Sequence, residues 1–346
     1  MKIAILNDTH CDYGKEYHKL NQKYFYEDLF FPYLLENNIS HIIHLGDFFE
    51  RKYNLFMKDL EFINNIFLKK LVEYNITMDI IPGNHDLPYD NSMEGCSLDL
   101  TIIGSNKNVR VHKKFTTLFN NILLVPWINA SNSVEIEQEI ARTDADVLMG
   151  HFELAGFPFS KNGIINEHGY ELKKVHKKFK HILTGHYHTK SSKDNVTILG
   201  TQFHLNKSDF DDRKFFHILD TETLELTAIE NKFHLYKKIN YSPSNNYEDI
   251  SEYRNTLTFI YVQQEHIDKK YNILLERLRE ITFNTDSILE KNLIFKEGKT
   301  LEEIVLKNKS EEEKMEEYVG LITTDLDKNI LFNKLKTLLK ECTNEV

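Results

Sequence analysis

The sequence has 346 residues, of which 41% are hydrophobic, and its formal net charge is −10. A chain of this length can bury a substantial core and is long for one domain, so we expect more than one unit. The acidic balance argues against a protein held to nucleic acid mainly by a basic surface. It does not exclude nucleic acid, because carboxylates that bind divalent ions are neutralised in use.

The few cysteines and the lack of a long apolar run in the sequence favour a protein of a reducing, aqueous compartment. The three cysteines, Cys11, Cys96 and Cys342, are widely spaced and predict no thiolate metal site. No apolar run approaches the length of a membrane span, and the first residues are too short a run for a signal peptide. We therefore expect a soluble cytoplasmic protein (in the host cytoplasm if the protein comes from a phage) with no membrane partner.

Stretches typical of strands and helices alternate along the first two thirds of the chain, which predicts an α/β class. Helical stripes cover residues 17–37 and 54–74, and Pro32 is expected to kink or break the first. The predicted strands span residues 3–6, 41–45, 76–81, 122–125, 147–149, 182–184, 196–199 and 215–219.

The texture changes after about residue 220. Residues 240–250 are polar and rich in Asn, as in a linker. Alternation at 257–261 predicts a strand and the spacing over 267–281 a helix, which together form a small βα unit. Charged stretches with apolar stripes at 315–322 and 331–339 predict further helices.

Five of the predicted strands end in the same kind of polar cluster. Carboxylate, amide oxygen and imidazole are ligands that divalent ions such as Mn²⁺ accept. Glycines in these clusters permit tight turns, so short side chains can converge on one point. One such cluster proves little, but five in order indicate a shared site. The clusters are Asp8-Thr9-His10, Gly46-Asp47, Gly83-Asn84-His85-Asp86, Gly150-His151 and Gly185-His186-Tyr187-His188.

These motifs, in this order and spacing, resemble the calcineurin-like metallophosphoesterase superfamily. Within it the chain is similar to the SbcD-type DNA-repair nucleases. The strings GHFELAGF, TGHYHT, ILGTQF and MEEYVG resemble the branch formed by nuclease subunits of T-even-type bacteriophage recombination endonucleases. The resemblance is firm over residues 1 to about 220 and loose beyond.

The resemblance implies a fold, a domain order and partners. The fold is a four-layer αββα metallophosphoesterase sandwich over residues 1–220, with a small α/β DNA-capping domain over 221–290. C-terminal helices over 291–346 would bind an SbcC-type SMC-like ATPase, although spacing alone suits ordinary intramolecular packing equally well. A homodimer through the helix at 54–74 is likewise expected.

The resemblance also assigns roles to the clustered residues. It implies two divalent cations, Mn²⁺ before Mg²⁺, that share Asp47. One ion would be held by Asp8, His10, Asp47 and His188, and the other by Asp47, Asn84, His151 and His186. A water between the ions would attack phosphorus, and His85 would protonate the leaving 3′ oxygen. Asp86 would either orient His85 or cap the next segment.

One position departs from the cellular relatives, which usually read GD-x-x-His. Glu50 stands where that histidine would be. This leaves the balance between exonuclease and endonuclease action open, and we expect Arg51 or Lys52 to supply the missing contact to a DNA phosphate. The lysine-rich stretch 173–180 suits either a solvated helix face or a DNA contact.

The expected activity is a Mn²⁺-dependent DNA nuclease, with 3′→5′ exonuclease action on duplexes and endonuclease action on single strands, in recombination and repair. The alternatives are a phosphatase or cyclic-nucleotide phosphodiesterase of the same superfamily, and a catalytically silent scaffold for DNA ends. Protein phosphatases of the superfamily carry GDxVDRG and GNHE, where this chain has GDFFERK and GNHD. The complete set of motif residues argues against the scaffold.

Overall fold

The computed structural model describes residues 1–89, 91–158, 165–167, 169–170, 177–290, 319, 328 and 331–336. The chain divides into two compact units. The first comprises Met1–Ile239, Asn246–Ile260 and Ile273–Asp286, and the second Asn240–Asn245, Tyr261–Asn272 and Ser287–Val346. In the described part, no helix is both long and apolar enough to cross a membrane.

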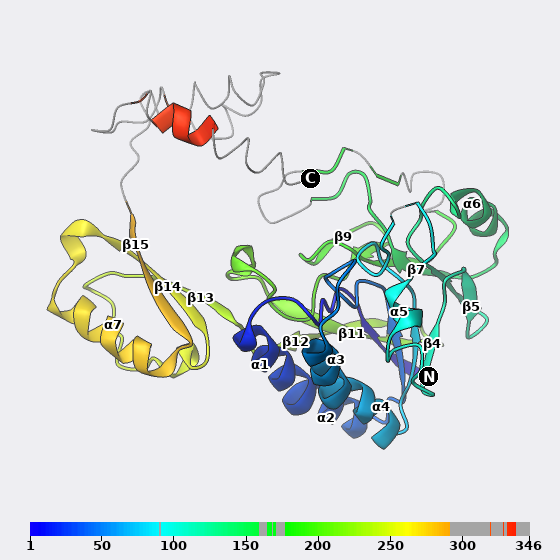
Figure 1. The fold of residues 1–346 in the computed structure, drawn as a ribbon, viewed down its shortest axis with the longest axis horizontal. Helices are drawn as coiled ribbons and strands as arrows, with labels where there is room; N and C mark the ends of the chain where they lie inside the picture. Colours follow the sequence, from blue (N-terminus) through cyan, green and yellow to red (C-terminus); the bar gives the residue numbers. More distant parts are fainter. Residues whose placement is uncertain are drawn as a thin grey trace. The chain divides into compact units, whose positions relative to one another are not determined.

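Two six-stranded sheets make up the centre of the first unit (Figure 1). In the first sheet, β1 to β4 run parallel to one another, and β11 is antiparallel to both of its neighbours, β1 and β12. Its order is β12 (Leu226–Asn231), β11 (Lys214–Asp220), β1 (Lys2–Leu6), β2 (His41–His44), β3 (Thr77–Ile80) and β4 (Val109–Val111). The second sheet has the order β5 (Thr116–Leu118), β6 (Ile122–Val125), β7 (Val147–His151), β8 (His181–Gly185), β10 (Val196–Ile198) and β9 (Ser191–Lys193).

Each sheet buries both of its faces, and the pleat of β1 shows how. Ile3 and Ile5 belong to a buried cluster that draws on both sheets, with residues such as Leu124 and Met149 from the second. Ala4 and Leu6, on the opposite side of the same strand, belong to a cluster that includes aromatic residues of the helices. The two sheets therefore pack face to face.

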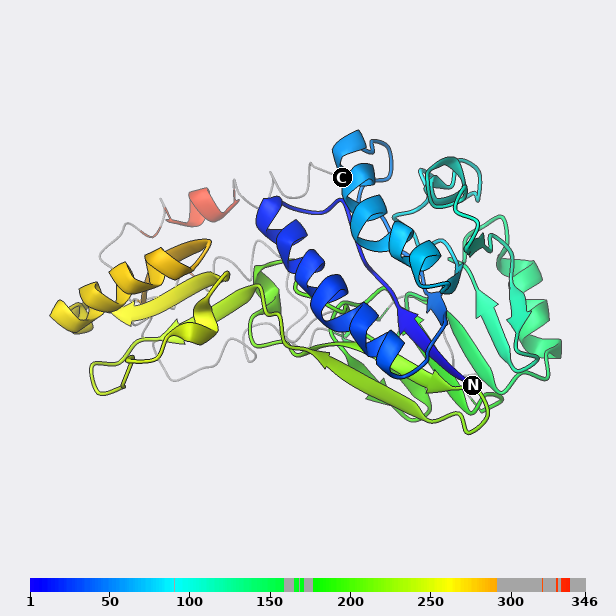
Figure 2. The same ribbon diagram turned by 90° about the horizontal axis from the view of Figure 1, so that it is seen from below.

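Helices cover the outer faces of the two sheets (Figure 2). On the first sheet lie α1 (Glu16–Phe25) and α2 (Phe31–Glu36), with α3 (Met57–Ile63) and α4 (Lys69–Glu73). On the second lies α6 (Ser133–Arg142), whose Ile136 and Ile140 are buried. The αββα sandwich expected from the sequence is confirmed.

A π-helical segment joins the helices of each consecutive pair. Tyr26–Phe30 joins α1 to α2, and Asn64–Leu68 joins α3 to α4. Pro32, expected to kink or break the first helix, lies in the first turn of α2, where its missing N–H is tolerated. The N–H of Phe31 reaches back to the carbonyl of Tyr26, so a wider turn accommodates the proline and helical structure continues beyond it.

The predicted βα unit is present as β14 (Leu257–Gln263) and α7 (Lys269–Ile281). Its sheet has the order β13-β14-β15, with β13 at Tyr236–Asn240 and β15 at Asn284–Glu290. Because β12 pairs with β11, the first sheet extends beyond the predicted domain boundary at residue 220. The limits of the predicted domains remain a prediction. The helix expected at 315–322 lies mostly outside the described residues, whereas 331–336 is helical.

A buried carboxylate on β3 ties neighbouring strands together. Asp79, which has no exposed surface, accepts two hydrogen bonds of 2.7 Å from Arg110. Nε2 of His112 lies 2.6 Å from the same carboxylate and Nε2 of His41 lies 2.9 Å from it. Although burial alone would raise the pKa of Asp79, these basic partners lower it.

Candidate metal centre

The predicted site residues lie at the carboxyl ends of β1, β2 and β3, which run parallel in the first sheet, and of β7 and β8, which run parallel in the second. Side chains at these ends can converge because parallel strands end at the same edge of a sheet. Asp8 and His10 follow β1, Asp47 follows β2, Asn84 and His85 follow β3, His151 ends β7, and His186 and His188 follow β8.

The loops that carry these residues have a sparsely populated backbone conformation. Asp8, His10 and Asp47 have φ values of 46°, 43° and 52°, in the left-handed region, and His186 has φ of 83°. Such conformations are unfavourable for residues with a Cβ and persist where the surrounding structure fixes them. Two backbone bonds do so here: Asp8 donates to the carbonyl of Gly46 (2.9 Å), and His10 donates to that of Asp47 (3.1 Å).

Glycine is required where the loops touch the acidic side chains. A Cβ on Gly83 would overlap Oδ1 of Asp47 and lie 2.5 Å from the Asp47 nitrogen. A Cβ on Gly185 would lie 2.7 Å from Oδ2 of Asp8. The two carboxylates are therefore packed directly against bare backbone.

The first group of candidate ligands consists of Asp8, His10 and His188, whose ligand atoms all lie within 4.8 Å of one another. Nε2 of His10 lies 3.9 Å from Oδ1 of Asp8 and 3.9 Å from Oδ2 of Asp47. Nε2 of His188 lies 3.9 Å from Oδ1 of Asp8. These separations leave room for an ion between the atoms.

The second group consists of Asp47, His151 and His186, again within 4.8 Å. Nε2 of His151 lies 3.2 Å from Oδ2 of Asp47 and 3.1 Å from Oδ1 of Asn84. Nδ1 of His186 lies 3.1 Å from the same Asn84 oxygen. Asp47 Oδ2 thus faces ligand atoms of both groups, so one carboxylate can serve two ions.

The buried polar atoms fit a pair of cations. Among the described residues, Nε2 of His10 is buried with no hydrogen-bond partner, although it faces two carboxylates. A buried imidazole nitrogen without a partner is costly, and an ion would satisfy it. Nδ1 of His151 donates to the carbonyl of Leu45 (2.7 Å), which leaves Nε2 as the nitrogen that would bind an ion after losing its proton.

The pKa values divide the four histidines into pairs. Burial lowers the pKa of His10, but Glu50, Asp47 and Asp8 outweigh it and raise that pKa to about 9. For His151, burial is likewise outweighed by Asp47 and Asp8, and its pKa rises to about 9. Burial lowers the pKa values of His186 and His188 to about 4. Protons on two histidines thus supply positive charge to the acidic site.

Glu50 contacts two histidines of the site. Its Oε2 lies 2.7 Å from Nδ1 of His10, and its backbone carbonyl accepts a 2.8 Å hydrogen bond from Nδ1 of His85. A carboxylate at Nδ1 favours a proton there and directs Nε2 of His10 toward the carboxylates of Asp8 and Asp47. No sequence pattern indicated this role, because it follows from contacts between residues that are 35 or more positions apart.

His85 is held from two sides and remains accessible. Its backbone N–H donates to Oδ1 of Asp47 (2.8 Å), and its Nδ1 is engaged by the Glu50 carbonyl. The side chain is 32% exposed, whereas that of His10 is 1% exposed. Its ring meets that of His10 edge-on at 5.2 Å. Nε2 of His85 is thus left for a substrate beside the ligand groups.

Asp86 and Asp12 brace the loops. Asp86 accepts hydrogen bonds from the backbone N–H groups of Phe48, Phe49 and Gly83, at 2.9 to 3.3 Å. Burial and the charge of Asp47 raise the pKa of Asp86 to about 7, against the effect of these N–H groups. Asp12 accepts from the N–H of Glu50 (2.6 Å). The structure therefore places the Asp86 carboxylate on the loop backbone.

The residues expected to contact DNA are placed as follows. Arg51 pairs with Asp59 (3.0 Å) and lies 3.7 Å from Asp12, so carboxylates of the chain already neutralise much of its charge. Lys52 is half-buried. Residues 173–176 of the lysine-rich stretch lie outside the described residues, and Lys180 pairs with Asp146.

Comparison with known proteins adds independent information. The calcineurin-like phosphoesterase family profile matches residues 1–190. "Exonuclease subunit 1" of Enterobacteria phage T4 is 31% identical over 316 residues, which cover 90% of each chain.

Similar solved structures include an archaeal phosphodiesterase and a dimetal phosphatase from Danio rerio. The first has 18% identity and a TM-score of 0.36, over 67% of this chain and 100% of that one. The second has 11% identity and a TM-score of 0.39, over 63% of this chain and 91% of that one.

Proposed function

Because the chain belongs to the calcineurin-like phosphoesterase family, we propose that it is a two-metal nuclease that hydrolyses phosphodiester bonds of DNA. The observation that carries the proposal is the pair of ligand groups that meet at Asp47, with the accessible His85 beside them. The phage relative, whose name describes an exonuclease and which matches 90% of this chain, supports a nucleic-acid substrate.

The ligand groups define which residues would hold the ions. Asp8, His10 and His188 would hold one, and Asn84, His151 and His186 the other, with Asp47 between them. When bound, two divalent cations supply a nucleophile at neutral pH and offset the negative charge that builds on the phosphoryl oxygens. Oxygen and imidazole ligands suit Mn²⁺, which we propose ahead of Mg²⁺.

His85 is proposed as the general acid. The leaving sugar oxygen needs a proton as its bond to phosphorus breaks. Because the Glu50 carbonyl fixes Nδ1, Nε2 is the atom that would donate this proton. The His85 side chain is 32% exposed, whereas that of His10 is 1% exposed, so a phosphodiester could approach His85 without displacing a ligand.

The proposed DNA substrates and partners are those expected from the family resemblance of the sequence. We propose 3′→5′ exonuclease action on duplex DNA and endonuclease action on single strands, in recombination and repair. The relative is named as a subunit, which supports action within a complex. The proposed partner is an SbcC-type SMC-like ATPase bound through residues 291–346, and the proposed oligomer is a homodimer.

A DNA digestion tests the proposal directly. End-labelled duplex and circular single-stranded DNA are incubated with Mn²⁺ or Mg²⁺ and either the wild type or His85→Ala. We expect metal-dependent shortening of the duplex and cutting of the circle by the wild type. A roughly 100-fold or greater loss is expected for His85→Ala, as for a missing general acid. DNA of unchanged length with the wild type would refute the nuclease assignment.

A further inference from the structure

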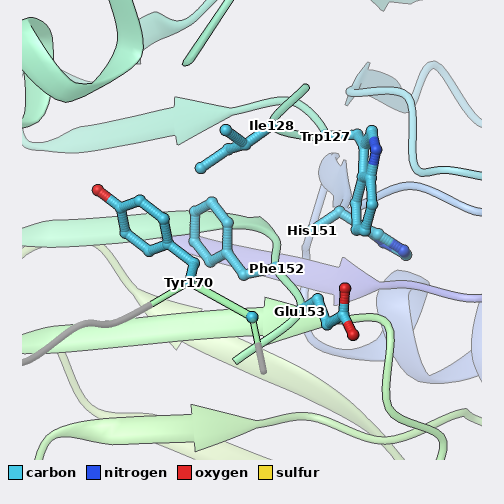
Figure 3. A pocket seen from close by; sticks show the side chains of 7 residues that line it. Trp127, Ile128, His151, Phe152, Glu153 and Tyr170 are labelled. Carbon is cyan, nitrogen blue, oxygen red and sulfur yellow. The ribbon is translucent and has the colours of Figure 1, made fainter. Parts of the chain in front are cut away.

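A cavity of about 270 Å³ opens beside the second ligand group (Figure 3). Its wall is largely aromatic and aliphatic, with one carboxylate. The lining residues are Trp127, Ile128, His151, Phe152, Glu153, Gly169 and Tyr170.

The cavity and the second ligand group share a wall. His151 belongs to both. The Trp127 ring packs against the two imidazoles of that group, with centroids 5.8 Å from His151 and 5.2 Å from His186. The backbone N–H of Trp127 donates to the carbonyl of Pro82 (3.0 Å), which anchors this wall to the loop that carries Asn84. An occupant of the cavity therefore lies about one side chain away from the proposed ions.

The chemistry of the wall restricts the occupant. Figure 3 shows the rings of Tyr170 and Trp127 on opposite sides of the cavity, with Phe152 between them. Such surfaces bind flat, uncharged rings through stacking and dispersion. Glu153, whose carboxylate accepts a 3.2 Å hydrogen bond from Asn166, makes the polar edge. An anionic edge repels phosphate but accepts hydrogen bonds from the N–H groups of a base.

We propose that this cavity is a pocket for an unpaired nucleobase, that of the nucleotide whose phosphate lies at the metal centre. The inference rests on the proposed function and names its substrate form. A nucleotide joins an anionic phosphate to a flat neutral base through one sugar, and the site offers matching surfaces side by side. The cationic centre takes the phosphate, and the aromatic pocket takes the base.

The pocket selects unpaired DNA. In a duplex the faces of a base are stacked and its hydrogen-bonding edge is paired, so the base must leave the helix before it can enter. Single strands and frayed ends supply such bases at little cost. The substrate at the metal centre is therefore a strand whose reacting nucleotide is already unpaired.

The test compares two phosphates in one strand. A labelled single-stranded oligonucleotide carries one abasic nucleotide among natural ones, and cleavage next to each is measured with the full chain and Mn²⁺. Stacking of one base corresponds to roughly a tenfold preference, so the wild type cleaves beside the abasic nucleotide roughly tenfold more slowly. In Tyr170→Ala the two sites are cleaved at similar rates.

Two further variants guard against misfolding. Tyr170→Phe keeps the ring and retains the preference. Phe119→Ala removes an exposed aromatic ring from the turn between β5 and β6 and also retains it. Equal cleavage at both sites by the wild type, or an unchanged preference in Tyr170→Ala, overturns the pocket while leaving the nuclease proposal standing. No cleavage of the natural strand at all overturns the nuclease proposal instead.

Discussion

Substitution of Glu50 tests whether its carboxylate positions His10 for metal binding in the first ligand group. Glu50→Ala removes the carboxylate that lies 2.7 Å from Nδ1 of His10. It leaves the backbone carbonyl that holds His85, so the proposed general acid keeps its anchor. The substitution therefore separates the positioning of a metal ligand from the positioning of the acid.

The expected magnitude follows from two independent scales. A hydrogen bond to a charged group contributes about 1.5–3 kcal/mol. Loss of the outer partner of a metal-binding histidine weakens metal affinity about 10- to 100-fold, or about 1.4–2.8 kcal/mol. Since the scales agree, we expect the Kd for one Mn²⁺ to rise about 10- to 100-fold. The second group, which Glu50 does not touch, should change little.

Calorimetric titration with Mn²⁺ measures both sites. Glu50→Gln keeps an oxygen that can accept from Nδ1 of His10, so its Kd should rise less than that of Glu50→Ala. Glu61→Ala, which removes an exposed glutamate of α3, is the matched control and should bind as the wild type does. Two wild-type affinities in a folded Glu50→Ala protein would refute the positioning role.

Three further predictions concern the packing and charge of the fold. Gly83→Ala should lower metal-dependent phosphodiester hydrolysis at least about 100-fold, because its Cβ would displace Asp47 from between the ions; wild-type rates would contradict this. His10 and His151, with pKa values raised to about 9, carry protons at pH 7.5, and Mn²⁺ must displace about two of them. Affinity should therefore rise with pH up to about 9, and calorimetry in PIPES and Tris, whose ionisation enthalpies differ, should give different apparent enthalpies; identical enthalpies after correction for metal–buffer binding would contradict proton release. The lowered pKa of Asp79 stabilises the fold above the unfolded pKa of about 4, and this contribution is lost as pH falls further. Urea unfolding should show Asp79→Asn to be about 1–3 kcal/mol less stable at pH 7, with a smaller difference at pH 3; an equal difference at both pH values would contradict the linkage.

The central strands were predictable because each is an apolar run that ends at a polar cluster. Ile122–Val125 was found at its observed limits, and others lay within a residue or two. Short edge strands such as β4, β5 and β9 have only three residues each, too few for a periodic pattern to emerge. Pairing across the sheet, which the local sequence does not encode, defines them.

The site was predictable in its residue types and only partly in its geometry. Asp8 and Asp47 could be read as ligands because chemistry and position coincide at strand ends. Their left-handed backbones could not be predicted, since few residues other than glycine adopt this conformation and the hydrogen bonds that fix it involve carbonyls distant in the sequence. From the sequence, Glu50 was interpreted only as a replacement of the motif histidine of the cellular relatives. Its contact with His10 depends on the fold, which brings the Glu50 carboxylate to that ring.

The most direct test of the account is anomalous diffraction at the manganese edge from crystals soaked in Mn²⁺. We expect two peaks, one bounded by Asp8, His10 and His188 and the other by Asn84, His151 and His186, with Asp47 reaching both. A single peak, or two peaks of which only one contacts Asp47, would contradict a metal centre shared through that carboxylate.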